Sequence, residues 1–334
     1  MRAARGAAED PTVGQLSEGE ILRRIAARTG RAAAAHVGPG DDAAVVAAPS
    51  GSVVATTDTL VHGPDFRLAW SSGYDLGWKA AAVNLADIAA MGARPTGLLV
   101  ALAMPDDTRI SFVESIADGL REACAALAPG CAVVGGDLTV SPTLTLAVTA
   151  LGDTEGRPPV LRSGATPGDV LAVAGELGLA GRGLAVLFDR FRDPAGTPVP
   201  VDATRLQAGD PEALAAQLRP APPIGLGPVA AVAGATAMMD VSDGLGLDAR
   251  RLADSSDVTL ELDASALGDD PRAAIEGGED HALLATFAGE ALPPGFRVIG
   301  RVVERGDAPL RIDGKPYGGP GGWDPYRDWD SVAG

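Results

Sequence analysis

The chain has 334 residues, of which 46% are hydrophobic and 21% are charged, a balance typical of a globular protein with about two domains. Its formal net charge of −17 argues against nucleic acid as a partner, because a phosphate backbone would be repelled over most of the surface. No apolar run approaches the roughly 18 residues of a membrane-spanning helix, and residues 1–6 lack the apolar core of a signal peptide. We therefore expect a cytoplasmic protein without a membrane partner.

Apolar periodicity and turn residues predict the elements of the first half. Residues 1–16 are expected to form a loose leader, and Ser17-Glu-Gly-Glu20 has the spacing of a capping box that opens a helix. Asp75 is expected to cap a longer, Ala-rich helix that stops before Gly92 and Pro95. The predicted elements are a helix from 17 to about 30, strands at 43–48 and 52–61, a helix from 75 to 91, a strand at 97–104, a helix at 110–127, and strands at 131–135 and 143–151.

The polar, Gly- and Pro-rich segment 152–159 predicts a domain boundary. We expect an N-terminal domain at 17–155 and a C-terminal domain at 156–334. The predicted elements of the second half are strands at 169–174, 237–241 and 282–287, and helices after 183, near 210–218 and 226–234, and from about 244. Strands and helices mix without a strict β-α-β rhythm, so the fold class expected is mixed α+β.

Several common phosphate-binding motifs are absent. The only two lysines are Lys79 and Lys315, and neither stands in a P-loop sequence. Protein-kinase motifs are also missing, and the glycines of 175–183 do not make a dinucleotide-binding fingerprint. A ligand that carries phosphate would therefore have to be bound in another way.

The cysteines and histidines predict no metal or redox centre. Cys124 and Cys131 lack metal-ligand spacing and are interpreted as small buried apolar residues rather than a redox pair. His36, His62 and His281 are scattered along the chain, and we interpret each as an ordinary polar residue.

Acidic residues inside or next to apolar segments are the most informative feature. Thr56 and Asp58 alternate on one face of a predicted strand, and Asn84 and Asp87 lie three residues apart on one face of a predicted helix. The other acidic motifs stand beside predicted strands and helices: Gly40-Asp-Asp42, Gly135-Gly-Asp137, Asp240-Val-Ser-Asp-Gly244 and Gly277-Gly-Glu-Asp280. Each alone is usually a turn or a cap.

Taken together, these carboxylates predict a metal site. Burying an ionised carboxylate destabilises the folded protein, by on the order of several kcal/mol, unless a cation lies beside it. Mg²⁺ is typically held by a few carboxylates together with substrate phosphates. The pattern therefore predicts a Mg²⁺-dependent enzyme, with ATP as the natural companion of the metal.

These motifs resemble those of thiamine-monophosphate kinases over roughly residues 17–326. The resemblance also rests on Thr57-Asp-Thr-Leu60, Asn84-Leu-Ala-Asp-Ile-Ala-Ala-Met-Gly-Ala93 and Arg162-Ser-Gly-Ala-Thr-Pro-Gly168, which occur in the family's order. That family belongs to the aminoimidazole-ribonucleotide-synthetase-like ATP-binding superfamily. The resemblance implies two α/β domains and a homodimer formed through the N-terminal strands.

The resemblance also implies a reaction and a set of residues. ATP would phosphorylate thiamine monophosphate to thiamine diphosphate by direct in-line transfer, with several Mg²⁺ ions and with K⁺ as an activator. The Mg²⁺ ligands implied are Asp41, Thr56, Thr57, Asp58, Asp87, Asp137, Asp240 and Asp243. The ATP contacts implied are Gly136, Asp137, Arg162 and Ser242, and the contacts to the thiamine end are Asp65, Glu279 and Trp323.

The sequence departs from the family's pattern around the acceptor. Asp65 stands where a substrate-contacting histidine is expected, the segment between Leu262 and Gly277 is short, and Glu276 replaces a small residue. Two alternatives stay open. The chain could be another ATP-dependent phosphotransferase or synthetase of the same superfamily, or a non-catalytic nucleotide- or metal-binding module.

Overall fold

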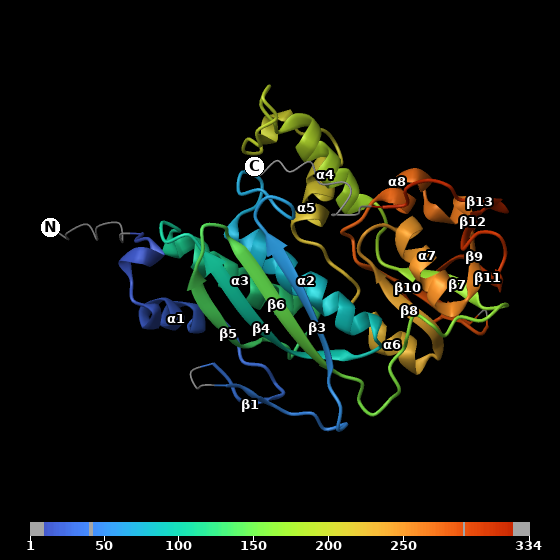
Figure 1. Cartoon of the computed structure of the whole chain (residues 1–334), viewed down its shortest axis with the longest axis horizontal. Coiled ribbons are helices and arrows are strands. Elements are labelled where there is room, and N and C mark those ends of the chain that lie inside the picture. The colour runs from blue at the N-terminus through green and yellow to red at the C-terminus, as the bar shows by residue number, and fades with distance from the viewer. Residues whose placement is uncertain (1–9, 40–42, 290, 323–334) are drawn as a thin grey trace.

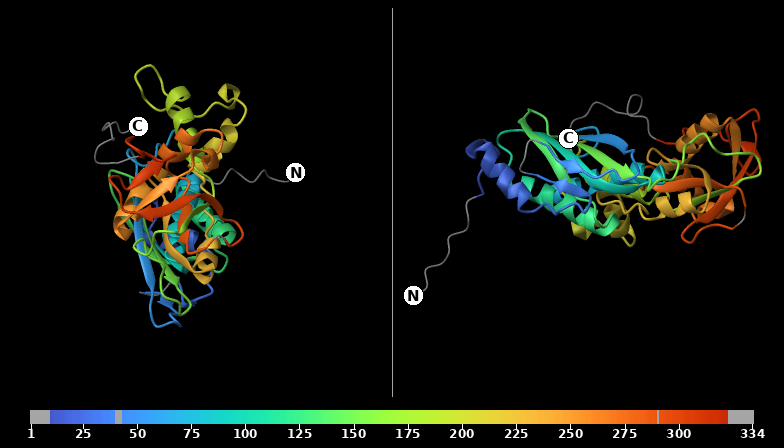
Figure 2. Two further views of the ribbon diagram at one scale, coloured as in Figure 1. Left: turned by 90° about the vertical axis from the view of Figure 1, so that its right-hand side faces the viewer. Right: turned by 90° about the horizontal axis from the view of Figure 1, so that it is seen from below.

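The computed structural model describes residues 10–39, 43–289 and 291–322. They form two α/β halves that lie side by side along the long axis of the molecule (Figures 1 and 2). Within these ranges no helix is both long and apolar enough to cross a membrane. The mixture of sheets and helices confirms the α+β fold class expected from the sequence.

The first half is built on a four-stranded sheet. Its elements are η1 (Val13–Gln15), α1 (Glu18–Ala26), β1 (Ala35–Val37), β2 (Val45–Val46), β3 (Val54–Val61), α2 (Gly73–Ala90), β4 (Arg94–Met104), α3 (Ile110–Leu127), β5 (Val133–Val140) and β6 (Thr145–Asp153). The strand order is β3-β6-β4-β5, and α2 and α3 lie against one face of the sheet (Figure 1). Leu146, Val148 and Ala150 of β6 are buried against these helices, whereas the alternate residues of β6 are only half-buried.

Helix α2 begins one turn earlier than its predicted cap. Ser72 is the N-cap: its hydroxyl accepts a hydrogen bond from the Asp75 amide, and the Asp75 carboxylate accepts one from the Ser72 amide. The prediction of Asp75 as the cap was therefore wrong by three residues, because Asp75 is the second partner of the capping box. Gly77 and Gly119 then let α2 and α3 cross closely, since a Cβ on either would clash with the backbone of the other helix.

Strand β5 does not end at the Gly135-Gly-Asp137 motif as predicted. It continues to Val140, and Asp137 lies within it, in register with Ala101 of β4. A Cβ at Gly136 would clash with the Val100 carbonyl oxygen. Close packing of two strands therefore accounts for this glycine.

The described part of the expected leader is attached to the first half rather than loose. The Val13 amide donates to the Thr108 carbonyl at 2.8 Å, and the Ile110 amide donates to the Pro11 carbonyl at 2.9 Å. The Val13 side chain is buried in the core. Residues 1–9 lie outside the described ranges.

The second half contains a seven-stranded sheet and a projecting helical hairpin. Its elements are β7 (Val170–Ala174), α4 (Leu179–Arg190), η2 (Ala203–Arg205), α5 (Asp210–Leu218), α6 (Leu226–Val232), β8 (Ala235–Val241), α7 (Leu245–Ser256), β9 (Val258–Leu262), η3 (Ala264–Leu267), α8 (Pro271–Glu276), β10 (Ala282–Phe287), β11 (Arg297–Glu304), β12 (Leu310–Ile312) and β13 (Lys315–Pro316). The strand order is β13-β12-β9-β11-β7-β10-β8. Helices α4 and α5 project at the top of Figure 1. They are joined to the first half through Trp70, whose indole N–H donates to the Phe191 carbonyl at 3.1 Å.

One apolar core continues across both halves. It joins Leu85 and Ile88 of α2 to Met238 of β8 and to Leu283 and Phe287 of β10. The predicted boundary at 155/156 falls directly after β6, and the halves that it separates are packed together by α2. This packing brings α2, which carries Asp87, against β8 at the edge of the second sheet.

Candidate active site

Three carboxylates from three elements converge where the two halves meet. Thr56 and Asp58 point from β3 toward α2: the Thr56 hydroxyl donates to Asp87 Oδ2 at 2.6 Å, and the Asp58 amide donates to Asn84 Oδ1 at 3.0 Å. These contacts confirm that each predicted pair shares a face. Asp240 stands near the end of β8 in the other half and raises the pKa of both Asp58 and Asp87. Residues that are distant in the sequence therefore form one cluster of carboxylates, called the acidic group below: Asp58, Asp87 and Asp240.

The electrostatics of this group favour a bound cation. Burial, Asp240 and Asp58 raise the pKa of Asp87 to about 6, against an opposing hydrogen bond from Thr56. Burial also raises the pKa of Asp58, with Asp240 and Glu279 adding to the effect. Like charges held together in a partly desolvated site repel one another, and a divalent cation would relieve that repulsion.

The protein side chains do not by themselves form a closed metal cage. Within the described ranges, no three His, Cys, Asp or Glu side chains are grouped closely enough to hold a metal ion. The available donors are carboxylate and hydroxyl oxygens, which are the ligands that Mg²⁺ prefers. Because Mg²⁺ commonly completes its coordination with substrate phosphates and water, an open set of oxygen donors fits it.

His281 belongs to this site, so its interpretation as an ordinary polar residue was wrong. Its ring is buried, with Nδ1 3.0 Å from Asp240 Oδ2. Burial lowers the pKa of His281, but Asp240, Glu279 and Asp87 outweigh burial and raise it. The signal that the sequence offered was its position directly after Gly-Gly-Glu-Asp280.

Three glycine turns of the second half pack together beside the acidic group. A Cβ at Gly277 would come within 2.7 Å of the Gly178 Cα, and one at Gly278 would come within 2.5 Å of the Ser242 carbonyl oxygen. The Glu279 amide donates to that same Ser242 oxygen at 2.8 Å. Asp280 accepts a hydrogen bond from the Ala180 amide at 2.8 Å, which fixes the start of α4. Small residues are therefore required where the turns meet.

Asp243 is held by a second acidic residue that the sequence analysis did not select. The Asp243 amide donates to Asp248 Oδ2 at 3.0 Å, and Arg251 Nη1 bridges the Asp243 and Asp248 carboxylates at 2.6 and 2.7 Å. Burial, Asp243 and Asp240 raise the pKa of Asp248 to about 6. Asp248 and Arg251 thus orient the turn that carries Ser242 and Asp243.

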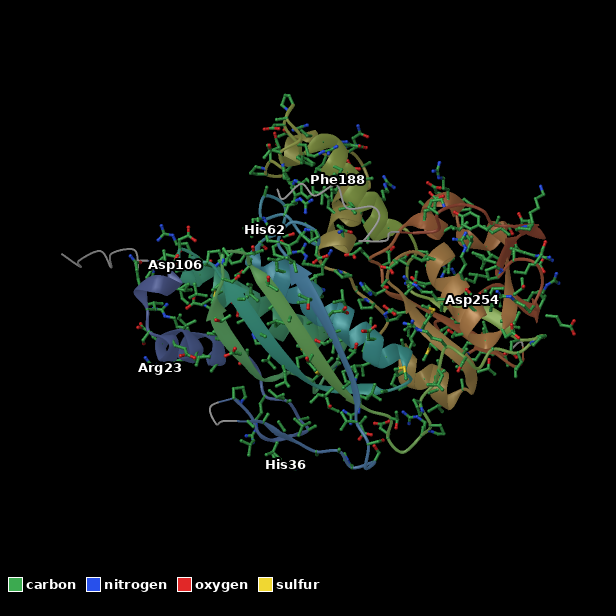
Figure 3. The ribbon with its side chains drawn as sticks, in the orientation of Figure 1. Arg23, His36, His62, Asp106, Phe188 and Asp254 are labelled. Atoms are coloured by element: carbon green, nitrogen blue, oxygen red, sulfur yellow. The ribbon has the colours of Figure 1, made fainter. Side chains whose placement is uncertain are left out.

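A cavity of about 1240 Å³ opens beside these turns. Its aromatic side is formed by Phe66 and Trp70 of the loop after β3 and by Phe188 of α4, which Figure 3 labels. Its polar side carries Lys79 of α2, whose Nζ lies 2.8 Å from Glu279 Oε2. A space of this size can hold two small phosphorylated molecules.

The predicted site residues that the structure describes divide into two groups. Those lining the cavity or the acidic group beside it are Thr56, Asp58, Asp65, Asp87, Asp240, Ser242, Asp243 and Glu279. Asp65 accepts a hydrogen bond from the Val61 amide at 2.7 Å, and burial raises its pKa despite this bond. Asp41 and Trp323 lie outside the described residues.

Four predicted residues lie elsewhere in the described chain. The Thr57 hydroxyl bonds to Thr149 Oγ1 at 3.2 Å, on the opposite face of the sheet from Asp58. Gly136 and Asp137 are exposed on the far edge strand β5, and Asp137 faces the side of the sheet that α2 leaves uncovered. Arg162 is exposed, and its carbonyl accepts a hydrogen bond from Ser256 at 2.7 Å.

The fold, together with strand β3 that carries Asp58, identifies a protein related to AIR synthase. The family model for the AIR synthase related protein N-terminal domain matches residues 40–154, which contain β3, α2 and the four-stranded sheet. A solved structure of a thiamine-monophosphate kinase from Stenotrophomonas maltophilia superposes with a TM-score of 0.74 at 33% identity, covering 90% of this chain and 98% of that chain. A solved structure of AaThiL complexed with AMPPCP and TMP gives a TM-score of 0.72 at 33% identity, covering 85% and 90%.

Sequence comparison narrows the class to one family. The thiamine-monophosphate kinase of Mycobacterium tuberculosis is 41% identical over 340 residues, covering 97% of this chain and 96% of that protein. That of Corynebacterium glutamicum is 38% identical over 335 residues. The chain therefore belongs to the thiamine-monophosphate kinase family, which confirms the resemblance found in its motifs.

Proposed function

We propose that this protein transfers the γ-phosphoryl group of ATP to the phosphate of thiamine monophosphate, producing thiamine diphosphate. The observation that carries the proposal is the convergence of Asp58, Asp87 and Asp240 from both halves beside a cavity of about 1240 Å³. Membership of the family supports the identity of both substrates.

Mg²⁺ is the cofactor that suits this site. Asp58, Asp87, Asp240 and Asp243 would share several Mg²⁺ ions with the substrate phosphates, with the Thr56 hydroxyl supporting Asp87, and bound Mg²⁺ would neutralise charge on the phosphates. Asp41 and Thr57 remain proposed ligands on the resemblance alone. Asp137 faces the uncovered side of the sheet, which is where we expect the second copy of a homodimer to pack.

The residues of this chain have positioning roles rather than acid–base roles. The attacking atom is a phosphate oxygen that is already ionised at neutral pH, so no general base is needed. The main obstacle is repulsion between two anions, which the site overcomes by holding them in line within the cavity. Direct transfer without a phosphoenzyme follows, and a phosphorylated protein on the reaction path would contradict it.

The two substrates have different proposed contacts. Ser242 lines the cavity and is a proposed ATP contact, whereas Gly136, Asp137 and Arg162 do not line it and remain proposed ATP contacts on the resemblance alone. Asp65, Glu279 and Trp323 are the proposed contacts to the thiamine end, and the aromatic side formed by Phe66, Trp70 and Phe188 would pack against its rings. We also propose that K⁺ activates the enzyme and that the protein is cytoplasmic. Its two domains would comprise residues 17–155 and 156–334.

The deciding experiment is the synthesis of thiamine diphosphate. The purified chain is incubated with thiamine monophosphate, ATP, Mg²⁺ and K⁺, and the product is oxidised to fluorescent thiochrome and separated. Product that requires both ATP and Mg²⁺ is expected. ATP binding without product would mean that the acceptor is another compound, and Asp65 would be the first residue to examine.

A further inference from the structure

Lys79 is a buried cation on the wall of the cavity. It stands on α2 with only 5% of its side chain exposed, and it is one of two lysines in the chain. Its Nζ lies 2.8 Å from Glu279 Oε2. With the Gln217 amide oriented to suit both of its neighbours, the Gln217 oxygen accepts from Nζ at 3.1 Å and its nitrogen donates to the Ala180 carbonyl at 3.0 Å.

These contacts leave the Lys79 ammonium with an N–H group that can donate to a further partner. An ammonium has three N–H donors, and within the described chain Glu279 and Gln217 take two of them. Glu279 is the more exposed member of the ion pair, with 42% of its side chain accessible against 5% for Lys79. A displaced Glu279 carboxylate would be rehydrated more easily than a buried ammonium.

The position of Glu279 also suits an exchangeable partner. Its backbone has φ of 74°, a left-handed conformation that is costly for a residue with a side chain and is often found at binding sites. Although burial raises the pKa of Glu279, Lys79 and His281 lower it further, so the carboxylate is ionised at neutral pH. The pair is therefore a charged contact inside a ligand cavity.

Lys79 lines the same cavity as Asp65 and Glu279. Lys79 lowers the pKa of Asp65, whereas Glu279 raises it. Glu279 also raises the pKa of Asp58. The other cations lining the cavity include the buried Arg67 and the exposed Arg182 and Arg297. A phosphate entering among these carboxylates needs a nearby positive charge, and Lys79 is the buried ammonium at that point.

We propose that Lys79 binds the phosphate of the acceptor, and that Glu279 holds the Lys79 ammonium in place until the acceptor enters. This inference rests on the proposed function and assigns a residue to the acceptor phosphate. The exchange makes and breaks hydrogen bonds only. The released Glu279 carboxylate then faces the positively charged thiazolium ring, in agreement with its proposed contact to the thiamine end.

A purely structural role makes a different prediction. The Lys79–Glu279 pair joins α2 to the second half, so it could serve only to hold the halves together. The proposed ATP contacts come from both halves. Loss of a structural link would therefore weaken ATP and thiamine monophosphate alike, whereas loss of a phosphate contact would weaken only the acceptor.

Calorimetric titration of Lys79→Gln separates these roles. The expected result is an increase of about 10- to 100-fold in the Kd for thiamine monophosphate, since a charge-assisted contact is lost. The Kd for AMPPCP with Mg²⁺ should stay within about twofold, and Lys79→Arg should recover part of the acceptor affinity. The matched control is Arg219→Gln, which breaks the 3.6 Å ion pair of Arg219 with Asp75 of α2 at a residue that does not itself line the cavity. Both of its Kd values should stay within about twofold.

Three results would overturn the inference. An unchanged Kd for thiamine monophosphate in Lys79→Gln would remove Lys79 from the acceptor site. Equal losses for thiamine monophosphate and AMPPCP would assign it the structural role. A wild-type protein that binds AMPPCP but not thiamine monophosphate would refute the proposed function itself. If Lys79→Gln fails to fold, the Kd values for both ligands are compared between the double variant Lys79→Gln/Glu279→Gln and the single variant Glu279→Gln. The outcomes stated above for Lys79→Gln then apply to that comparison.

Discussion

Asp87→Asn is expected to stabilise the metal-free protein at neutral pH while abolishing turnover. Burial, Asp240 and Asp58 raise the pKa of Asp87 from 3.8 to about 6. In the unfolded chain the carboxyl titrates near its ordinary value, so folding takes up a proton between about pH 4 and pH 6. Above pH 6 the ionised group therefore destabilises the folded state, and below pH 4 this penalty disappears.

The size of the effect follows from the difference between the two pKa values. A difference of about two pH units corresponds to about 3 kcal/mol, at about 1.4 kcal/mol per unit. We expect about half of this, roughly 1.5 kcal/mol, because solvent reaches part of the site and screens the repulsion. The asparagine oxygen can still accept the hydrogen bond that Thr56 donates, so that contact is kept.

Urea unfolding in EDTA measures this gain. Asp87→Asn should exceed the wild type in free energy of unfolding at pH 7.5, and the gain should become clearly smaller at pH 4.5. Asp107→Asn, at an exposed aspartate, is the control and should change stability by less than about 0.5 kcal/mol. A variant that is less stable than the wild type at pH 7.5, or a gain independent of pH, would refute the electrostatic account of the site.

Three further substitutions test other parts of the structure. Asp137→Asn should reduce thiamine diphosphate formation by about 100-fold or more with unfolding unchanged, since the side chain is exposed; an unaltered rate would remove Asp137 from the site. Gly136→Ala should lower the free energy of unfolding in urea by roughly 2–4 kcal/mol, because its Cβ meets the Val100 carbonyl oxygen; unchanged stability would mean that β4 and β5 separate freely. Asp248→Ala should cost roughly 1–3 kcal/mol in the same assay at pH 5, where the repulsion that raises the Asp248 pKa is reduced, by leaving the Asp243 amide and Arg251 without their partner, and a more stable variant at that pH would contradict this role.

Much of the local structure followed from the sequence. The helix at 110–127 has the predicted bounds, because its apolar spacing lies between clear turn residues. The pairs Thr56 with Asp58 and Asn84 with Asp87 were placed on shared faces by strand and helix periodicity alone. The order of the acidic motifs was sufficient to recognise the family.

Errors arose where an element's limits depended on its neighbours. Strand β5 continues through Gly135-Gly-Asp137 because β4 pairs with it, although glycines at that position are typical of a turn. Its register with β4 also turns Asp137 to the uncovered side of the sheet, away from Asp58. Periodicity assigns a residue to a face, but only pairing between strands decides what that face meets.

The tertiary structure alone assembled the site. Lys79 carried no recognisable pattern and His281 only its place after Gly-Gly-Glu-Asp280, and their roles come from Glu279 and Asp240, which lie 200 and 41 residues away along the chain. Asp248 likewise acquires its role only when α7 presents it to the turn at Ser242 and Asp243. The sequence determined the secondary structure and the family because those depend on local spacing and motif order. Packing of α2 against both sheets decided which charges face each other, because Coulombic and hydrogen-bond energies depend on distance in space rather than on separation along the chain.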